Sequence, residues 1–218
     1  MKNKEKNIEN TIIDSYMKYV LENGKKPKSI HSFVSEINLD ESKFYDQYAS
    51  FDSLEKEIFA LFSKHTIDTL SKSKEYETFD SRNKLLSYYY TFFENLKANR
   101  SFVTYLLNDW KSQLKSLKTL SRLRTSFLDY VETLDIKTID FKEEKIEKVQ
   151  KKIIGESAWI QLLLTLKFWL DDESNGFEKT DIFIEKMLNT SFDIAANSSL
   201  KSVVDLGKFL YKEKIQMN

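Results

Sequence analysis

The sequence predicts an all-α protein of nine or ten helices. Two observations support this fold class. Apolar residues recur at helical spacing along almost the whole chain, and helix-breaking residues are scarce, with 4 Gly and 1 Pro among 218 residues. The turn chemistry that a β-rich protein requires is therefore missing. Apolar residues make up 41% of the chain and aromatic residues 14%, which supplies material for a sizeable core.

Local signals divide the first part of the chain into four expected helices. The first carries an apolar stripe and stops at Asn23-Gly24. Ser29 is expected to cap a short second helix, and Asp40 a third. A longer helix runs from about Phe51 into the low seventies. Because a tight turn joins the second and third helices, they have the pattern of a helix-turn-helix module.

Helical spacing continues in the rest of the chain. A polar stretch, Ser71 to Ser81, is expected to be a loop, and the polar segment Lys2 to Lys6 a flexible arm. The remaining expected helices cover about residues 85–96, 99–110, 111–134, 140–170, 179–196 and 200–213.

Composition excludes several classes of function. The chain has no Cys, which removes disulfides, zinc–cysteine sites, iron–sulfur clusters and a cysteine nucleophile. Two His are too few for a histidine-rich metal site, and no glycine-rich phosphate loop occurs. Lys+Arg and Asp+Glu both number 34, so the protein is not globally basic. We therefore expect a function in binding, with no enzymatic activity, no cofactor and no metal.

The segment from Ile12 to Leu54 carries a family pattern, without a gap. Its positions are Ile12-Ile13-Asp14, Glu22, Asn23-Gly24, Ser29-Ile30, Phe33-Val34, Leu39, Tyr45, Tyr48, Ser50 and Leu54. In these positions the chain resembles the N-terminal domain of TetR-family repressors. The resemblance implies a helix-turn-helix domain at residues 1–52 and a helical ligand-binding and dimerisation domain at residues 53–218. It also implies a cytoplasmic homodimer that regulates transcription by binding duplex DNA in response to a ligand.

The resemblance and the charges of the chain together suggest the DNA contacts. The residues expected to reach DNA are Lys28, Ser29, Lys43, Tyr45 and Gln47. The family more often has a small residue or Gly where Asn38 stands. From Asn38 to Glu55 the sequence has five acidic residues and one basic residue, a net charge of −4 that opposes docking on phosphates. Lysines 25, 26 and 28 and the arm are expected to compensate.

A second, shorter resemblance leaves an alternative open. The stretch contains Leu170-Asp171-Asp172-Glu173-Ser174, Thr180, Phe183-Ile184 and Glu185-Lys186. It is similar to a segment of the TetR-like ubiquinone-biosynthesis accessory proteins, which bind lipid or isoprenoid rather than DNA. The plain interpretation is a turn followed by an amphipathic helix. The alternatives are therefore a TetR-like protein that binds a lipid or isoprenoid and no longer binds DNA, and a scaffold whose fold serves only dimerisation.

Aromatic residues in the C-terminal part predict a closed pocket for a small apolar ligand or lipid, although aromatic residues at helical spacing more often form core. The candidates are Phe93, Tyr105, Trp110, Phe127, Trp159 and Phe168. A two-fold dimer is expected through helices at about Gly155–Leu170 and Lys179–Ala196, since the first is apolar nearly all round. The most apolar run, Ala158 to Leu170, is shorter than the ~20 residues of a bilayer span, so we expect no integral membrane segment.

Overall fold

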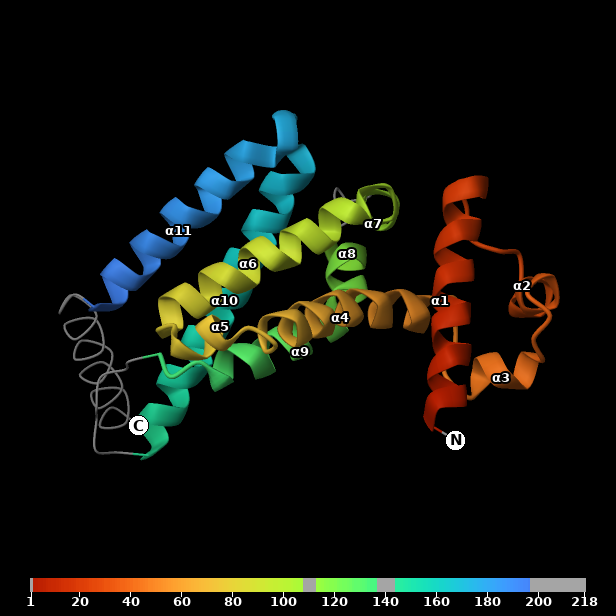
Figure 1. Cartoon of the computed structure of the whole chain (residues 1–218), viewed down its shortest axis with the longest axis horizontal. Coiled ribbons are helices and arrows are strands. Elements are labelled where there is room, and N and C mark those ends of the chain that lie inside the picture. The colour runs from red at the N-terminus through yellow and green to blue at the C-terminus, as the bar shows by residue number, and fades with distance from the viewer. Residues whose placement is uncertain (1, 108–112, 137–143, 197–218) are drawn as a thin grey trace, which may run out of the picture. The chain divides into compact units, whose positions relative to one another are not determined.

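The computed structural model of the protein describes residues 2–107, 113–136 and 144–196 (Figure 1). Within them lie eleven α-helices and one 3-10 helix, and no strand, which confirms the predicted all-α fold class. The elements are α1 Lys2–Asn23, α2 Ile30–Glu36, α3 Glu41–Tyr45, α4 Phe51–Leu70, α5 Lys74–Thr78, α6 Ser81–Ala98, α7 Arg100–Leu107, α8 Gln113–Thr119, α9 Ser121–Thr133, α10 Glu144–Asp171, η1 Asn175–Phe177 and α11 Glu178–Ala196.

Four local expectations were wrong. Asp40 stands at the N-cap position of α3, but its side chain makes no capping hydrogen bond. The expected flexible arm is helical from Lys2, because its Lys and Glu residues are good helix formers and no Gly or Pro interrupts them before Gly24. The expected loop after α4 contains α5, whose first turn is capped by the Ser73 hydroxyl. Two helices, α8 and α9, replace the single one expected, with a break at Leu120. The helix expected at residues 200–213 lies outside the described residues.

The chain divides into two compact units. The first comprises residues 1–72 and 91–127, and the second residues 73–90 and 128–218. Helices α6 and α9 contribute residues to both units. A separate helix-turn-helix domain ending at residue 52 stays a prediction.

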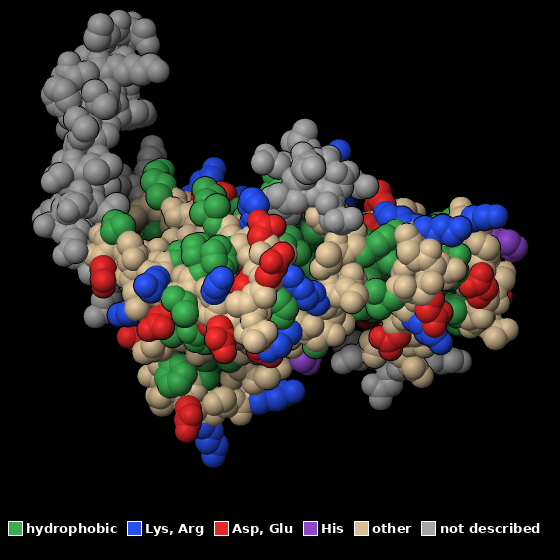
Figure 2. All heavy atoms as spheres, turned by 90° about the horizontal axis from the view of Figure 1, so that it is seen from above, with side chains coloured by type: hydrophobic (Ala, Val, Ile, Leu, Met, Phe, Trp, Pro, Cys, Tyr) green, Lys and Arg blue, Asp and Glu red, His purple; other side chains and the backbone are tan. Residues whose placement is uncertain are grey.

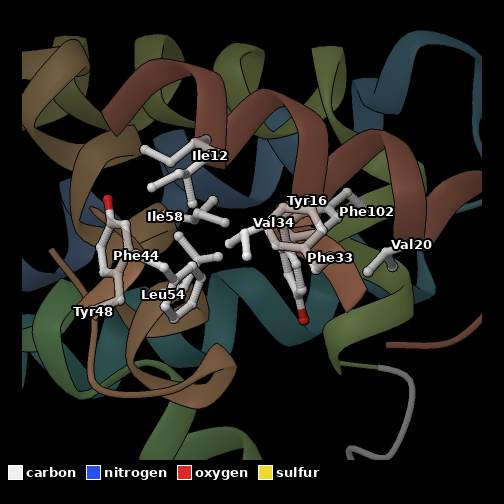
Figure 3. Packing of buried hydrophobic residues seen from close by; sticks show 11 residues of the cluster. Ile12, Tyr16, Val20, Phe33, Val34, Phe44, Tyr48, Leu54, Ile58 and Phe102 are labelled. Atoms are coloured by element: carbon white, nitrogen blue, oxygen red, sulfur yellow. The ribbon is translucent and has the colours of Figure 1, made fainter. Parts of the chain in front are cut away.

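In the first unit, α1 to α4 surround an apolar cluster that α7 completes (Figure 3). Tyr16 of α1 lies among rings from three other helices, with centroids 6.0 Å from Phe33, 5.2 Å from Phe51 and 6.3 Å from Phe102. Phe44, the one buried residue of α3, has its ring 6.3 Å from that of Phe33. Side chains of α1, α2, α3 and α4 thus depend on one another for burial.

In the second unit, a single carboxylate holds the turn between α10 and α11. Asp172 Oδ1 accepts hydrogen bonds from the Ser174 amide (2.9 Å) and hydroxyl (2.7 Å). Its Oδ2 accepts from the Thr180 amide (2.9 Å) and hydroxyl (2.7 Å). Burial alone would raise the pKa of the Asp172 carboxyl, but these hydrogen bonds outweigh it and lower the pKa to about 2. The Asp172, Ser174 and Thr180 pattern is therefore explained by the turn.

We expect the Asp172→Asn substitution to cost about 2 kcal/mol at neutral pH, because a carboxylate whose pKa falls from 3.8 to about 2 on folding stabilises the fold by roughly that much. This stabilisation is present above the usual pKa and is lost as the pH falls from about 4 towards 2, so the variant should lack that part of the acid dependence. Urea unfolding across a pH series measures it. Asp171→Asn is the control: its carboxylate is exposed and pairs with Lys167 one helical turn away, so a small effect is expected. Equal losses in the two variants would contradict the assignment.

Helix α10 also contains the one candidate membrane span among the described helices. Residues Glu147–Asp171 are long and apolar enough to cross a membrane by length and composition. The core helix of a soluble protein can have the same length and composition, so a single such helix is weak evidence for a span.

Candidate nucleic-acid interface

The helix α2 begins at a reciprocal serine cap, as the sequence predicts for Ser29. The Ser32 amide donates to Ser29 Oγ (3.1 Å), and the Ser29 amide donates to Ser32 Oγ (3.3 Å). This capping box satisfies amides that the first helical turn leaves unpaired. It fixes where the turn after α1 ends and where α2 starts.

A tight turn joins α2 to α3. Asn38 lies in the left-handed region, with φ of +54°, and the Leu39 amide donates to the Val34 carbonyl (2.9 Å). Asn adopts this conformation more readily than other residues with a side chain, apart from Asp and His. The turn thus has the sharp geometry that a helix-turn-helix requires, without a glycine.

Asn38→Gly is expected to preserve or raise stability, because glycine adopts positive φ without steric cost. Asn38→Val is expected to cost about 1–3 kcal/mol, because a β-branched residue is strained there. Urea unfolding followed by circular dichroism measures both changes. Asn10→Val, at an exposed position within α1, controls for the effect of valine itself. A valine as well tolerated at 38 as glycine would contradict this account of the turn.

Helix α3 buries one side and exposes the other. Phe44 points into the apolar cluster, whereas Lys43, Tyr45 and Gln47 are exposed. Lys28 and Ser29, just before α2, are exposed as well. A side-chain contact links the starts of α2 and α3, with His31 Nδ1 3.3 Å from Glu41 Oε2. All five residues expected to contact DNA are therefore open to solvent: two on α3, Gln47 just after it, and two on the turn that leads into α2.

Carboxylates balance the cations of this surface. Lys43 Nζ lies 3.2 Å from Asp46 Oδ2, so its charge is partly neutralised within α3's own surface. Glu41 faces His31, and Asp40 is exposed beside it. The structure thus retains the excess of acidic side chains that the sequence shows around the third helix.

In the turn between α1 and α2, one lysine points towards α4 and not towards solvent, which the sequence does not indicate. Lys26 Nζ lies 2.7 Å from Asp52 Oδ1 and 2.8 Å from Glu55 Oε2, both on α4. Glu55 is only 4% exposed, and its other oxygen accepts a hydrogen bond from Tyr16 (2.6 Å). Two carboxylates of the protein thus already engage the Lys26 ammonium, which the sequence leads us to expect at DNA phosphates.

Comparison with known proteins decides the family. A family model described as the tetracyclin repressor-like C-terminal domain matches residues 84–210, which is more than half of the chain. The chain belongs to the TetR family. A solved structure, of a transcriptional regulator of the TerR/AcrR family from Aquifex aeolicus VF5, is similar over 84% of this chain and 98% of its own, at 19% identity and a TM-score of 0.44. No curated protein matches the chain.

The aromatic residues expected to line a ligand pocket in this TetR-family protein are spread over both compact units. Phe93 and Phe127 are buried in the first unit, and Tyr105 packs there against the apolar cluster of α1 to α4. Trp159 is buried in the second unit. Phe168 is 37% exposed and stacks on Phe183, with centroids 4.6 Å apart. Trp110 lies outside the described residues.

Proposed function

We propose that this TetR-family chain is a ligand-responsive transcription regulator that binds duplex DNA as a homodimer in the cytoplasm. The observation that carries the proposal is the helix-turn-helix of α2 and α3. Phe44 anchors α3 to the apolar cluster, while the exposed side chains of Lys43 and Tyr45 on α3 and of Gln47 just after it present an ammonium group, a phenol hydroxyl and an amide. Lysine donates well to guanine and glutamine pairs well with adenine in the major groove, while tyrosine reaches phosphates.

The test is a titration of fluorescently labelled duplex DNA over a series of salt concentrations. Lys28→Met should weaken binding at low salt and flatten the salt dependence by about one unit of slope, because one phosphate contact is lost. Lys18→Met is the control, because Lys18 is an exposed lysine on α1 and its loss changes the net charge equally. No binding of any duplex at low salt would refute the proposal, and so would equal effects of the two variants.

The homodimer is proposed from an apolar face on α10 and α11. Five large apolar side chains of α10 are well exposed and lie within one helical face: Val149, Ile153, Ile160, Leu164 and Phe168. Ile182 and Ile194 of α11 are exposed as well. Hydrophobic side chains open to solvent are visible among charged ones in the view of Figure 2, from the side of α11. A second copy of the chain would cover this surface and remove the cost of exposing it.

Leu164→Glu is expected to convert the dimer to monomer at micromolar concentration, because a carboxylate would have to be buried in the apolar interface. Light scattering or sedimentation measures the change in mass. Leu21→Glu is the matched control, since Leu21 of α1 is comparably exposed but belongs to the other compact unit of the chain. A monomeric unmodified protein, or an unchanged dimer in Leu164→Glu, would contradict the proposed interface.

The ligand is proposed to be a small apolar molecule held by buried aromatic residues, and the first positions to test are Phe93 and Phe127 in the first unit and, as a separate candidate, Trp159 in the second. The family match does not favour the lipid-binding alternative, and the Asp172 motif behind it has a structural explanation in the turn before α11. Native mass spectrometry of protein purified without added ligand tests the proposal. A retained small molecule supports it, whereas a mass equal to that of the bare protein, together with no thermal shift by apolar compounds, opposes it.

A further inference from the structure

The turn between α1 and α2 carries three lysines with different surroundings. Lys25 and Lys28 are exposed, but Lys26 reaches into the protein towards α4. We propose that Lys26 is a positioning residue that, through the buried carboxylate of Glu55, fixes the DNA-facing turn of residues 25–29 to the first turn of α4. This inference goes beyond the proposed function and rests on it for its effect on DNA affinity.

The carboxylate of Glu55 joins three parts of the chain. Its Oε1 accepts the hydroxyl hydrogen of Tyr16 from α1, at 2.6 Å. Its Oε2 lies 2.8 Å from the Lys26 ammonium, which also contacts Asp52 one turn earlier on α4. Both oxygens therefore have a partner, as a carboxylate that is only 4% exposed requires.

The pair of Lys26 and Glu55 fixes the turn of residues 25–29, because loss of the pair would leave the buried Glu55 carboxylate without its cation. Taking one member out of a buried ion pair is strongly destabilising. Movement of the turn away from α4 would separate Lys26 from Glu55 and would therefore destabilise the protein. Pro27, which follows Lys26, is buried too, so the middle of the turn faces inward while Lys25 and Lys28 on either side face solvent.

The ionisation of Lys26 agrees with this geometry. Burial alone would lower the pKa of its ammonium group, but the hydrogen bonds and charges of Asp52 and Glu55 outweigh burial and raise that pKa above its usual value. Burial and the neighbouring Glu55 carboxylate raise the pKa of the Tyr16 phenol, which therefore remains a donor to Glu55. The Lys26 ammonium group therefore stays charged and paired with the carboxylates of Asp52 and Glu55. A contact with a DNA phosphate would require the ammonium group to leave these partners and point into solvent.

The decisive experiment is a double-mutant cycle on binding of a random-sequence DNA duplex. Lys26→Met is measured in the unmodified protein and in Glu55→Gln, which keeps an acceptor for the Tyr16 hydroxyl but removes the charge. In the unmodified protein, we expect Lys26→Met to weaken DNA binding about threefold to tenfold. In the Glu55→Gln background the same substitution should weaken binding less than about twofold, because coupled residues give non-additive effects. Lys26→Arg should retain most of the affinity. Lys28→Met is the contrasting variant, and it should lower the affinity for duplex DNA equally in the unmodified protein and in Glu55→Gln.

A second measurement needs no DNA. Backbone amide order parameters of Lys25, Lys28 and Ser29 should fall in Lys26→Met, from about 0.85 for rigid backbone towards the flexible range below about 0.6, and stay unchanged in Lys28→Met. Equal loss of affinity from Lys26→Met in both backgrounds would show a direct phosphate contact and overturn the proposal, as would unchanged order parameters. If the unmodified protein binds no duplex, the proposed function fails, and the order parameters still decide the role of Lys26.

Discussion

Reversing the charge of the α3 surface, with Asp40→Ser, Glu41→Lys and Asp46→His in one variant, is expected to raise affinity for random duplex DNA about tenfold to a hundredfold at low salt. The three changes alter the charge by +1, +2 and +1, with histidine neutral. The loss of Asp46 also releases Lys43, whose ammonium lies 3.2 Å from that carboxylate. Two cations, at 41 and 43, then become available for phosphates, so the salt dependence should steepen by about 1.8 units of slope.

The control places half of this charge change, +2 instead of +4, away from α3. Glu94→Lys lies on α6 in an exposed pair with Lys97, and it should raise affinity by much less. Fluorescence anisotropy at several salt concentrations measures both variants. If the control gains as much affinity per unit of charge as the triple variant, net charge decides binding and the α3 surface does not. Tight and steeply salt-dependent binding by the unmodified protein would show that the acidic side chains do not face the duplex.

Phe44→Ala is expected to lower the free energy of unfolding by about 3–5 kcal/mol, among the largest single effects that a core aromatic residue gives. The Phe44 ring is fully buried and packs against rings of Phe33, Tyr48 and Phe51. Its removal leaves a cavity under α3, a helix of five residues that has no other buried side chain. Such a short helix depends on tertiary packing for its stability.

Urea unfolding of Phe44→Ala measures the loss. Tyr45→Ala is the matched control, because Tyr45 is the next residue on α3 and 52% exposed, so its substitution should cost about 1 kcal/mol or less. The same control should lose DNA affinity if Tyr45 contacts a phosphate. Similar destabilisation by the two substitutions would contradict the assignment of Phe44 as the anchor of α3.

The local features of the helix-turn-helix could be predicted from the sequence because each depends on neighbouring residues. The serine cap at Ser29, the stop at Gly24 and the turn at Asn38 are set by side chains within a few positions. The apolar spacing of α1 and α4 likewise predicts which faces are buried. These signals are short-range, so they need no knowledge of the tertiary structure.

The interactions of Lys26 and Glu57 could not be predicted in this way. Glu55 stands directly beside Leu54 in a stretch with several other acidic residues, and nothing local marks it as buried. Glu57 pairs with Lys64 on its own helix and with Arg122 of α9, far along the chain. Such pairs depend on how helices meet, which the spacing of apolar residues does not specify.

The candidate ligand residues show a different limit. Helical spacing identifies an apolar face, but it does not distinguish a side chain that fills the core from one that lines a pocket or lies on the surface. Phe127 is fully buried, whereas Phe168 is partly exposed on α10, although both stand at helical spacing in aromatic-rich segments. Lining a pocket therefore stays a prediction for each of the six.

The place of Phe102 in the apolar cluster bears on how the protein forms during synthesis. Its ring lies 6.3 Å from that of Tyr16 and belongs to α7, which the ribosome makes long after α1 to α4. At roughly 5–20 residues per second, the segment from Tyr45, where α3 ends, to Phe102 takes about 3–11 s to translate. For that interval the nascent helix-turn-helix keeps part of its apolar surface uncovered, within reach of chaperones and of other unfinished chains. The packing of the apolar cluster is complete only when α7 has been made.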